Sequence, residues 1–236
     1  MLITHGVGQM NFSVNELDRA TEVLAKKLIN DLKLRDGGVK RMKFAVIGYK
    51  SKRSTKGGVL VIGYNGHLDK SDKRERGGID WESYSDAEEE RSENGFDKLL
   101  DKHPYFKLFT QDFGLKNYLN ENIKFTDLVP IRTPQKKEIV EKFRGEFKGF
   151  QEECFDHLKV LIKEIEPELI LCNDADVSKL FLNKTSNQSK GGKYITSCKF
   201  GNIPVILSGQ QRTDNFSRGR LRREIMKTLE NGRMRQ

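Results

Sequence analysis

The sequence predicts an α/β protein, a three-layer αβα sandwich with a mostly parallel central sheet. Short apolar runs rich in β-branched residues recur at 59–62, 169–172 and 203–207, and such runs are typical of strands buried on both faces. Segments in which apolar residues have helical spacing separate several of these runs. Strands that alternate with helices of this length require mostly parallel pairing, which places helices on both faces of the sheet.

The N-terminal half contains two predicted strands and one long helix. Residues 13–16, Ser-Val-Asn-Glu, have the form of a capping box, and the apolar residues after them predict a helix over about 15–34. Residues 42–49 alternate weakly, which indicates an edge strand. Residues 59–66 predict a central strand that ends at a glycine-containing turn. The polar, acidic segment at about 67–95 shows no periodicity, so we expect a long loop or small insertion there.

The C-terminal half alternates between helices and strands. Residues 96–119 predict one or two short helices packed on the sheet, and 124–132 predict a second central strand. We expect Pro130 and Pro134 to end that strand, because proline cannot donate to a sheet ladder. A helix is predicted at 147–164 and is closed by Pro167, and a strand follows at 169–172. The next helix runs to about 182 and is capped by Asn173 or Asp174, and a polar loop follows at 183–192. Two strands at 194–198 and 203–207 are joined by a tight turn at 200–202, and a basic helix is predicted around 216–229.

Length and composition are those of one folded domain over 1–236. Of the 236 residues, 33% are charged and 36% hydrophobic, a balance typical of a soluble globular protein rather than a disordered one. The three cysteines are widely separated in apolar surroundings, which suits reduced thiols in the cytoplasm. No apolar stretch approaches the ~18 residues of a membrane span. We therefore expect a cytoplasmic protein with no membrane partner, and we favour a monomer.

Charge is unevenly spread along the chain, whose net charge is +9. Residues 33–56 hold nine basic residues and one acid, and residues 211–236 hold eight basic residues and three acids. Between these blocks, residues 80–101 carry nine acids and two bases. The basic blocks are typical either of a surface that binds nucleic-acid phosphates or of solvated helix faces, and charge alone does not separate these interpretations.

The strand ends resemble motifs of the uracil-DNA glycosylase superfamily. Residues 61–66, Val-Ile-Gly-Tyr-Asn-Gly, are similar to its Gly-Ile-Asn-Pro-Gly motif without the proline. Residues 126–130, Thr-Asp-Leu-Val-Pro, match its Thr-Asn-apolar-Val-Pro motif with Asp in place of Asn. The segment 154–170 resembles its helix-then-strand segment, and 206–209, Ile-Leu-Ser-Gly, stand where the family has His-Pro-Ser or Asn-Pro-Ser-Gly. In open α/β sheets, ligands bind outside the carboxyl ends of such strands.

The resemblance implies a uracil-DNA-glycosylase-like fold, DNA as the partner, and hydrolysis of the N-glycosidic bond of a damaged or modified base. The residue matching Asn65 positions the attacking water, and the loop matching Ser208 grips a phosphate and helps to stabilise the leaving base, so both are candidate catalytic residues. Asp127 matches the residue that reads the base edge, and Tyr64 beside Asn65 is a second candidate for base binding. The candidate phosphate-binding residues follow Ser208 in the chain: Gly209, Gln210, Arg212, Arg218 and Arg220.

The departures from the family pattern change the expected chemistry. The histidine of the last motif is missing, so stabilisation of the departing base falls to backbone donors near Gly209 or to Gln210. Removing one such donor typically costs ~100-fold or more in rate. An ionised Asp127 offers only acceptors, so it favours bases that display amino donors, such as cytosine or adenine, over uracil. An equally open interpretation is that Asp127 caps a helix or pairs with Arg132, since buried acids need partners.

Two classes of function stay open. The first is an enzyme that excises a base from DNA. The second is a non-catalytic nucleic-acid or nucleotide-binding protein on the same fold, which the missing histidine and the altered turn after Asn65 favour. We expect no metal or cofactor: Cys154, His157 and Cys172 are interpreted as helix and strand residues rather than ligands, and the iron–sulfur cluster of some glycosylase branches needs four cysteines where this chain has three.

Overall fold

The computed structural model describes five main segments of the chain and several short pieces. The segments are 57–67, 123–133, 148–185, 195–208 and 215–233, and the pieces are 23, 27, 43–44, 108–109, 113–115, 136–137, 140 and 188–189. The insertion expected beyond residue 67 lies outside the described residues, as do Gly209, Gln210 and Arg212. Of the helix expected over 15–34, Val23 and Lys27 are described, and both are helical.

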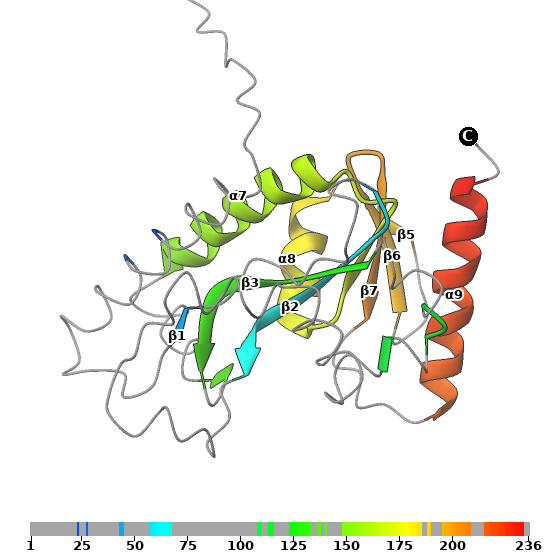
Figure 1. Cartoon of the computed structure of the whole chain (residues 1–236), viewed down its shortest axis with the longest axis horizontal. Coiled ribbons are helices and arrows are strands. Elements are labelled where there is room, and N and C mark those ends of the chain that lie inside the picture. Colours follow the sequence, from blue (N-terminus) through cyan, green and yellow to red (C-terminus); the bar gives the residue numbers. More distant parts are fainter. Residues whose placement is uncertain are drawn as a thin grey trace, which may run out of the picture.

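The described strands form one seven-stranded sheet in the order β1-β3-β2-β4-β7-β6-β5 (Figure 1). The four strands β3, β2, β4 and β7 are parallel to one another, whereas β1 at one edge and β6 and β5 at the other pair antiparallel. This confirms the predicted α/β class with a mostly parallel central sheet. The strands span Lys43–Phe44 (β1), Val59–His67 (β2), Ile123–Thr133 (β3), Leu169–Cys172 (β4), Gln188–Ser189 (β5), Ile195–Phe200 (β6) and Ile203–Ser208 (β7).

Helices cover both faces of the sheet. α7 (Lys148–Ile165) and α8 (Ala175–Lys184) pack on one face, where Phe155 and Phe181 lie in one apolar cluster with Leu60 and Ile62 of β2. α9 (Asn215–Arg233) packs on the other face, which it shares with the apolar residues described between 108 and 115. Figure 1 shows α9 on the side of the sheet away from α7 and α8. Because both faces are covered, the central strands read as continuous apolar runs rather than alternating ones.

Where the predicted elements fall mainly on described residues, they agree with the structure to within a few residues, with three corrections. β2 runs through the predicted glycine-containing turn to His67. β3 continues past Pro130 to Thr133, so Pro130 does not end the strand. Asn65 pairs with Val129 and His67 with Thr133, so four steps along β3 match two along β2, and no described residue of β1 or β2 pairs with Pro130 in register. The proline lies in this irregularity, where its missing N–H costs no ladder bond. In addition, the predicted polar loop at 183–192 contains the short edge strand β5.

Local chemistry explains where the helices before and after β4 end and begin. α7 ends at Ile165, because Glu166 takes a left-handed φ of 48° and Pro167 follows it. α8 begins after Asp174, whose extended backbone and side-chain oxygen make it the N-cap. The sequence left Asn173 and Asp174 as alternatives for this role, and the structure assigns it to Asp174.

Candidate functional site

β4 and β7 end at one level, which sets the carboxyl edge of the sheet, whereas β2 and β3 pass this level and continue to His67 and Thr133. Asp127 of β3 is paired in register with Gly63 of β2. One position earlier in β2, Ile62 pairs with Cys172, the last residue of β4, and Cys172 pairs with Leu207 of β7. The next row across the sheet therefore runs Asp127, Gly63, Asn173, Ser208. Three interstrand spacings separate its ends, which is about 14 Å.

The chain leaves this edge toward opposite faces from the two middle strands. The residues described between β2 and β3 pack on the α9 face, whereas α8, which follows β4, packs on the α7 face. The amide N–H of Asn173 donates to the carbonyl oxygen of Ile62 over 2.9 Å, so β2 and β4 stay joined up to this point. A sheet in which the first parallel strand lies between the second and third binds its ligands at the opening between the first and third strands. Here that opening lies between the ends of β2 and β4.

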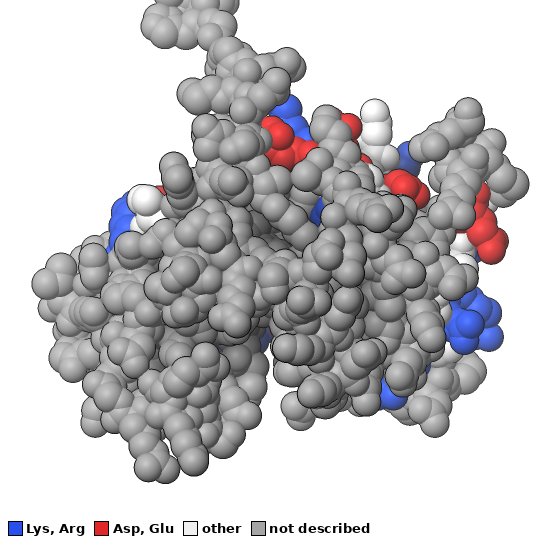
Figure 2. All heavy atoms as spheres, viewed as in Figure 1, with Lys and Arg blue, Asp and Glu red and all other residues white. Residues whose placement is uncertain are grey.

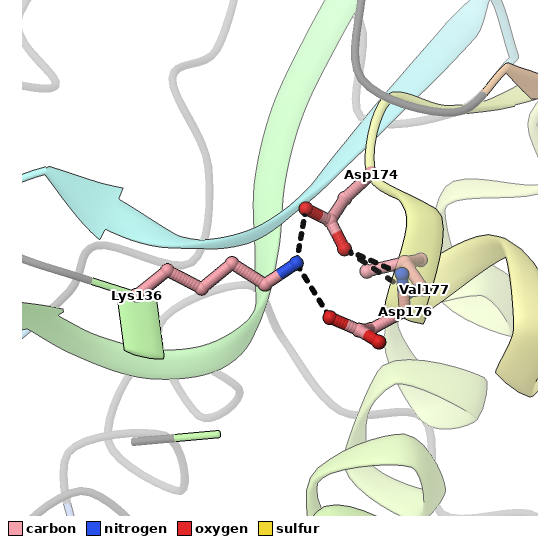
Figure 3. Close-up of polar contacts among 4 residues, drawn as sticks. All are labelled: Lys136, Asp174, Asp176 and Val177. Atoms are coloured by element: carbon pink, nitrogen blue, oxygen red, sulfur yellow. Dashed lines mark hydrogen bonds and ion pairs between the residues drawn. The ribbon is translucent and has the colours of Figure 1, made fainter. Parts of the chain in front are cut away.

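A cluster of charged side chains stands beside this opening (Figure 3). The Lys136 ammonium lies 2.5 Å from Oδ2 of Asp174 and 2.8 Å from Oδ2 of Asp176. The same nitrogen lies 4.4 Å from the centre of the Tyr64 ring, at the distance of a cation–π contact. Oδ1 of Asp174 meanwhile accepts hydrogen bonds from the backbone N–H groups of Asp176 and Val177, at 2.8 and 3.3 Å. One carboxylate thus caps α8 and holds Lys136.

The cluster joins three elements that are far apart in the sequence. Lys136 follows β3, Tyr64 lies in β2, and both carboxylates lie at the start of α8. The Lys136 side chain is 25% exposed, whereas that of Asp174 is 8% exposed. Two carboxylates face one ammonium group, so these three side chains carry a net charge of −1. Such a group attracts hydrogen-bond donors and cations more than it attracts phosphate.

The predicted catalytic residues lie at this edge, and their roles stay predictions. Asn65 lies in β2, where its backbone pairs with Val129 of β3. Ser208 is 2% exposed, and its hydroxyl donates to the carbonyl oxygen of Cys172 over 3.0 Å. This bond ties the end of β7 to the end of β4, so the hydroxyl already has a structural partner.

The predicted base-binding residues lie on neighbouring strands. Tyr64 is 4% exposed and belongs to the apolar cluster on the α7 face, where its ring meets Lys136. Asp127 is half-buried and pairs in register with Gly63, which has no side chain to crowd it. Along β3, Asp127 lies two positions before Val129, which pairs with Asn65 of β2. A ligand that carries hydrogen-bond donors would meet the Asp127 carboxylate at that position.

The predicted phosphate-binding arginines lie on α9, which follows β7 after six residues. Arg218 is half-buried near the start of the helix, and Arg220 is exposed. The other three predicted members of this set, between 209 and 212, lie outside the described residues. Sequence reasoning missed Lys136; its one signal was its position shortly after a central strand, because ligand sites of such sheets gather after strand ends.

The cysteines and the helix histidine belong to the core rather than to this edge. Burial raises the pKa of the Cys154 thiol to about 12, and burial also raises the pKa of Cys172 well above its usual value. Burial lowers the pKa of His157. Among the residues that the structure describes, no three His, Cys, Asp or Glu side chains are grouped closely enough to hold a metal ion. Nor is any helix in the described segments long and apolar enough to cross a membrane.

Comparison of the chain with models of known protein families finds no match, and comparison with curated proteins finds none either.

Proposed function

We propose that this chain is a divergent uracil-DNA-glycosylase-like protein that binds DNA and hydrolyses the N-glycosidic bond of a damaged or modified base. The observation that supports this most is the common edge of the sheet. Asn65 and Asp127 lie on adjacent parallel strands, and Ser208 ends a third strand at the same level. Three motif positions that are distant in the sequence therefore lie along the edge at which ligands of open α/β sheets bind, with about 14 Å between Asp127 and Ser208.

The chemistry proposed for Asn65 is orientation of water. A neutral amide has both an acceptor and donors, so it can hold a water molecule with one lone pair directed at a sugar carbon. The reaction adds this water across the bond between C1′ and the base nitrogen: the water oxygen bonds to C1′, the base leaves with the bonding electrons, and one proton of the water ends on the base or on solvent. The departing base needs donors nearby, and those donors belong to the chain after Ser208.

The proposed base is one that displays amino groups. Asp127, the residue proposed to read the base, lies in β3 in register with Gly63 of β2, and an ionised carboxylate offers acceptors only. Ionised carboxylates accept from the exocyclic amino group of cytosine or adenine, but they repel the O4 of uracil. A substrate related to cytosine or adenine therefore fits this side chain better than uracil.

A panel of duplexes tests this proposal. Each duplex carries one candidate lesion, such as uracil, hypoxanthine, a mismatch or a modified cytosine, and alkaline treatment cleaves the strand wherever a base has been excised. We expect excision of an amino-bearing base by the unaltered protein and its loss in Asn65→Ala with binding retained. Asp127→Asn restores the donor that uracil needs, so uracil excision should rise. Asp156→Asn, an exposed acid on α7, is the matched control. Strong uracil excision by the unaltered protein would refute the base assignment.

The second candidate is a non-catalytic nucleic-acid or nucleotide-binding protein on the same fold. One observation favours it: the Ser208 hydroxyl is buried and donates to Cys172, so it is not presented to a ligand in this structure. Binding to the panel without cleavage of any member, unchanged in Asn65→Ala, is the result that would establish this alternative.

A further inference from the structure

α9 has one apolar face, which is fixed against the sheet. Leu221, Ile225 and Leu229 follow one another at four-residue intervals, and each is at most 2% exposed. They belong to the cluster that covers the sheet on the side opposite α7. Because residues four apart lie on the same side of a helix, the orientation of α9 about its own axis is set by this packing.

The opposite face of α9 carries a basic stripe, made of Arg220, Arg223 and Lys227. All three are exposed. At 3.6 residues per turn they lie within about 60° of one another and roughly opposite the buried leucines. No carboxylate among the described residues pairs with any of the three. Figure 2 shows basic side chains along the first part of α9 and acidic ones toward its end.

The other two arginines of this region are used within the molecule. Gly114 has a φ of +70°, and a Cβ atom placed on it would lie 3.0 Å from Nε of Arg222. The guanidinium of Arg222 therefore packs directly over this glycine. Arg218 is half-buried and has an interaction partner in the structure. Arg218 and Arg222 thus make contacts within the molecule, although Arg222 is exposed, whereas the side chains of Arg220, Arg223 and Lys227 face solvent together.

We propose that the basic stripe is a track that binds the phosphate backbone of duplex DNA, whatever the base sequence of the DNA. The stripe spans eight residues, a rise of about 10 Å along the helix. One strand of a duplex carries about three phosphates over that length, which equals the number of cations in the stripe. α9 follows β7, whose last residue Ser208 lies at the carboxyl edge, and we place DNA on this track so that it reaches the candidate site. In that respect the inference rests on the proposed function.

The composition of the stripe favours nucleic acid over a lipid surface. A helix that lies on a membrane exposes large apolar side chains beside its basic ones. Among the described residues the exposed large hydrophobic side chains are Val23 and Val160, and neither belongs to α9. Two guanidinium groups and one ammonium group, with no exposed large apolar side chain beside them among the described residues, match a row of phosphates instead.

The test is the salt dependence of binding to a short undamaged duplex, followed by fluorescence anisotropy. Each phosphate contact contributes a slope of about −0.9 to the plot of log K against log salt concentration, so the triple variant R220Q/R223Q/K227Q should flatten the slope by up to about 2.7. Affinity at low salt should fall at least about tenfold, because charge neutralisation of phosphates supplies most non-specific binding. The variant R220K/R223K keeps the charges and should bind like the unaltered protein.

The matched control removes three lysines that are equally exposed but lie on other elements: K163Q/K179Q/K199Q, on α7, α8 and β6. It has the same net charge as the stripe variant and should keep the slope. Equal losses in both triple variants would overturn the inference, since binding would then follow net charge alone. Equal loss of binding to a polyglutamate peptide would overturn it as well, because the stripe would then select acidic chains in general.

The experiments give one pattern of results if the proposed function is wrong and another if the track is wrong. An undamaged duplex needs no extruded base, so the salt slope is measured whether or not the carboxyl edge recognises one. If the stripe variant alone flattens the slope while no lesion is excised, the track stands and the enzyme proposal fails. If lesions in short single strands are excised equally by both triple variants and duplex affinity is unchanged, the track fails and the enzyme proposal stands.

Discussion

Asp174 offers the sharpest test of how the carboxyl edge is held together. Its Oδ1 caps α8 through two backbone N–H groups, and its Oδ2 pairs with Lys136. Asparagine is as good an N-cap as aspartate but carries no charge. Asp174→Asn therefore removes the ion pair and keeps the cap, whereas Asp174→Ala removes both. The difference between the two variants isolates the cap.

The expected losses in the free energy of unfolding follow from the burial of Asp174 and from the second carboxylate, that of Asp176, beside Lys136. Loss of an N-cap costs about 1–2 kcal/mol. Loss of the ion pair costs less, about 0.5–1 kcal/mol, because Lys136 is partly exposed and keeps Asp176 at 2.8 Å. We thus expect Asp174→Ala to lower the free energy of unfolding by about 2–3 kcal/mol and Asp174→Asn by about 1 kcal/mol or less.

Urea denaturation followed by far-UV circular dichroism measures both differences. The control is Lys136→Met, which leaves the cap intact and removes the ion pair from the other side. The double variant Asp174→Asn with Lys136→Met should cost less than the sum of the two single changes, because both remove the same interaction. If Asp174→Asn were as destabilising as Asp174→Ala, the charge rather than the cap would hold the start of α8, and the reasoning would be wrong.

Two further predictions concern buried ionisable groups. Burial lowers the pKa of Lys124 from 10.5 to about 8, against the opposing charge of Glu168. Between these two pH values the unfolded chain binds more protons than the folded one, so the free energy of unfolding should rise from about pH 8 to 10.5. The rise should be about 1–2 kcal/mol, because solvent screens part of the effect. Lys124→Met should lose this rise, whereas the exposed Lys163→Met should keep it. Urea midpoints across this range measure it, and equal pH profiles for the three proteins would contradict it. The second prediction concerns the three thiols, which should resist a thiol-specific reagent near pH 8 in the folded protein and react after denaturation. The reason is that burial raises the pKa of each thiol. Rapid labelling of any one of them in the folded state would contradict this prediction.

The fold was predictable wherever a local pattern settles the structure. The run at 169–172 is apolar at every position, and it is β4, buried throughout. The helix after it needed a cap, and only two polar residues stood at the right place. Pro130 shows the limit of local rules: proline is excluded from a regular ladder, but an irregularity in register lets the strand continue past it. Pairing irregularities depend on the partner strand, so the strand's own sequence does not reveal them.

The candidate site was predictable to the level of strand ends but not of side-chain partners. The rule that ligands bind at carboxyl ends led to Asn65, Asp127 and Ser208, which the register places at one edge. Lys136 escaped that reasoning, because its partner Asp174 is 38 residues away and the two meet only when β3 and α8 are both in place. Likewise, nothing in the sequence shows that Arg222 packs on Gly114 while the neighbouring Arg223, equally exposed, does not.

The distribution of charge over the described surfaces constrains how a nucleic acid could approach. At the carboxyl edge, the Lys136 ammonium is already paired with Asp174 and Asp176, so it is poorly available to a phosphate. The exposed cations of α9 lie on another surface, on the side of that helix opposite the residues packed on the sheet. If one ligand engages both, its polyanionic part must follow α9 while an uncharged, donor-bearing part turns into the edge. A nucleotide extruded from a duplex has this division, since its base is neutral and its backbone is charged, and extrusion costs only a few kcal/mol. The two proposals are therefore mutually consistent: the stripe would set affinity for any duplex, and the edge would set which base is taken from it.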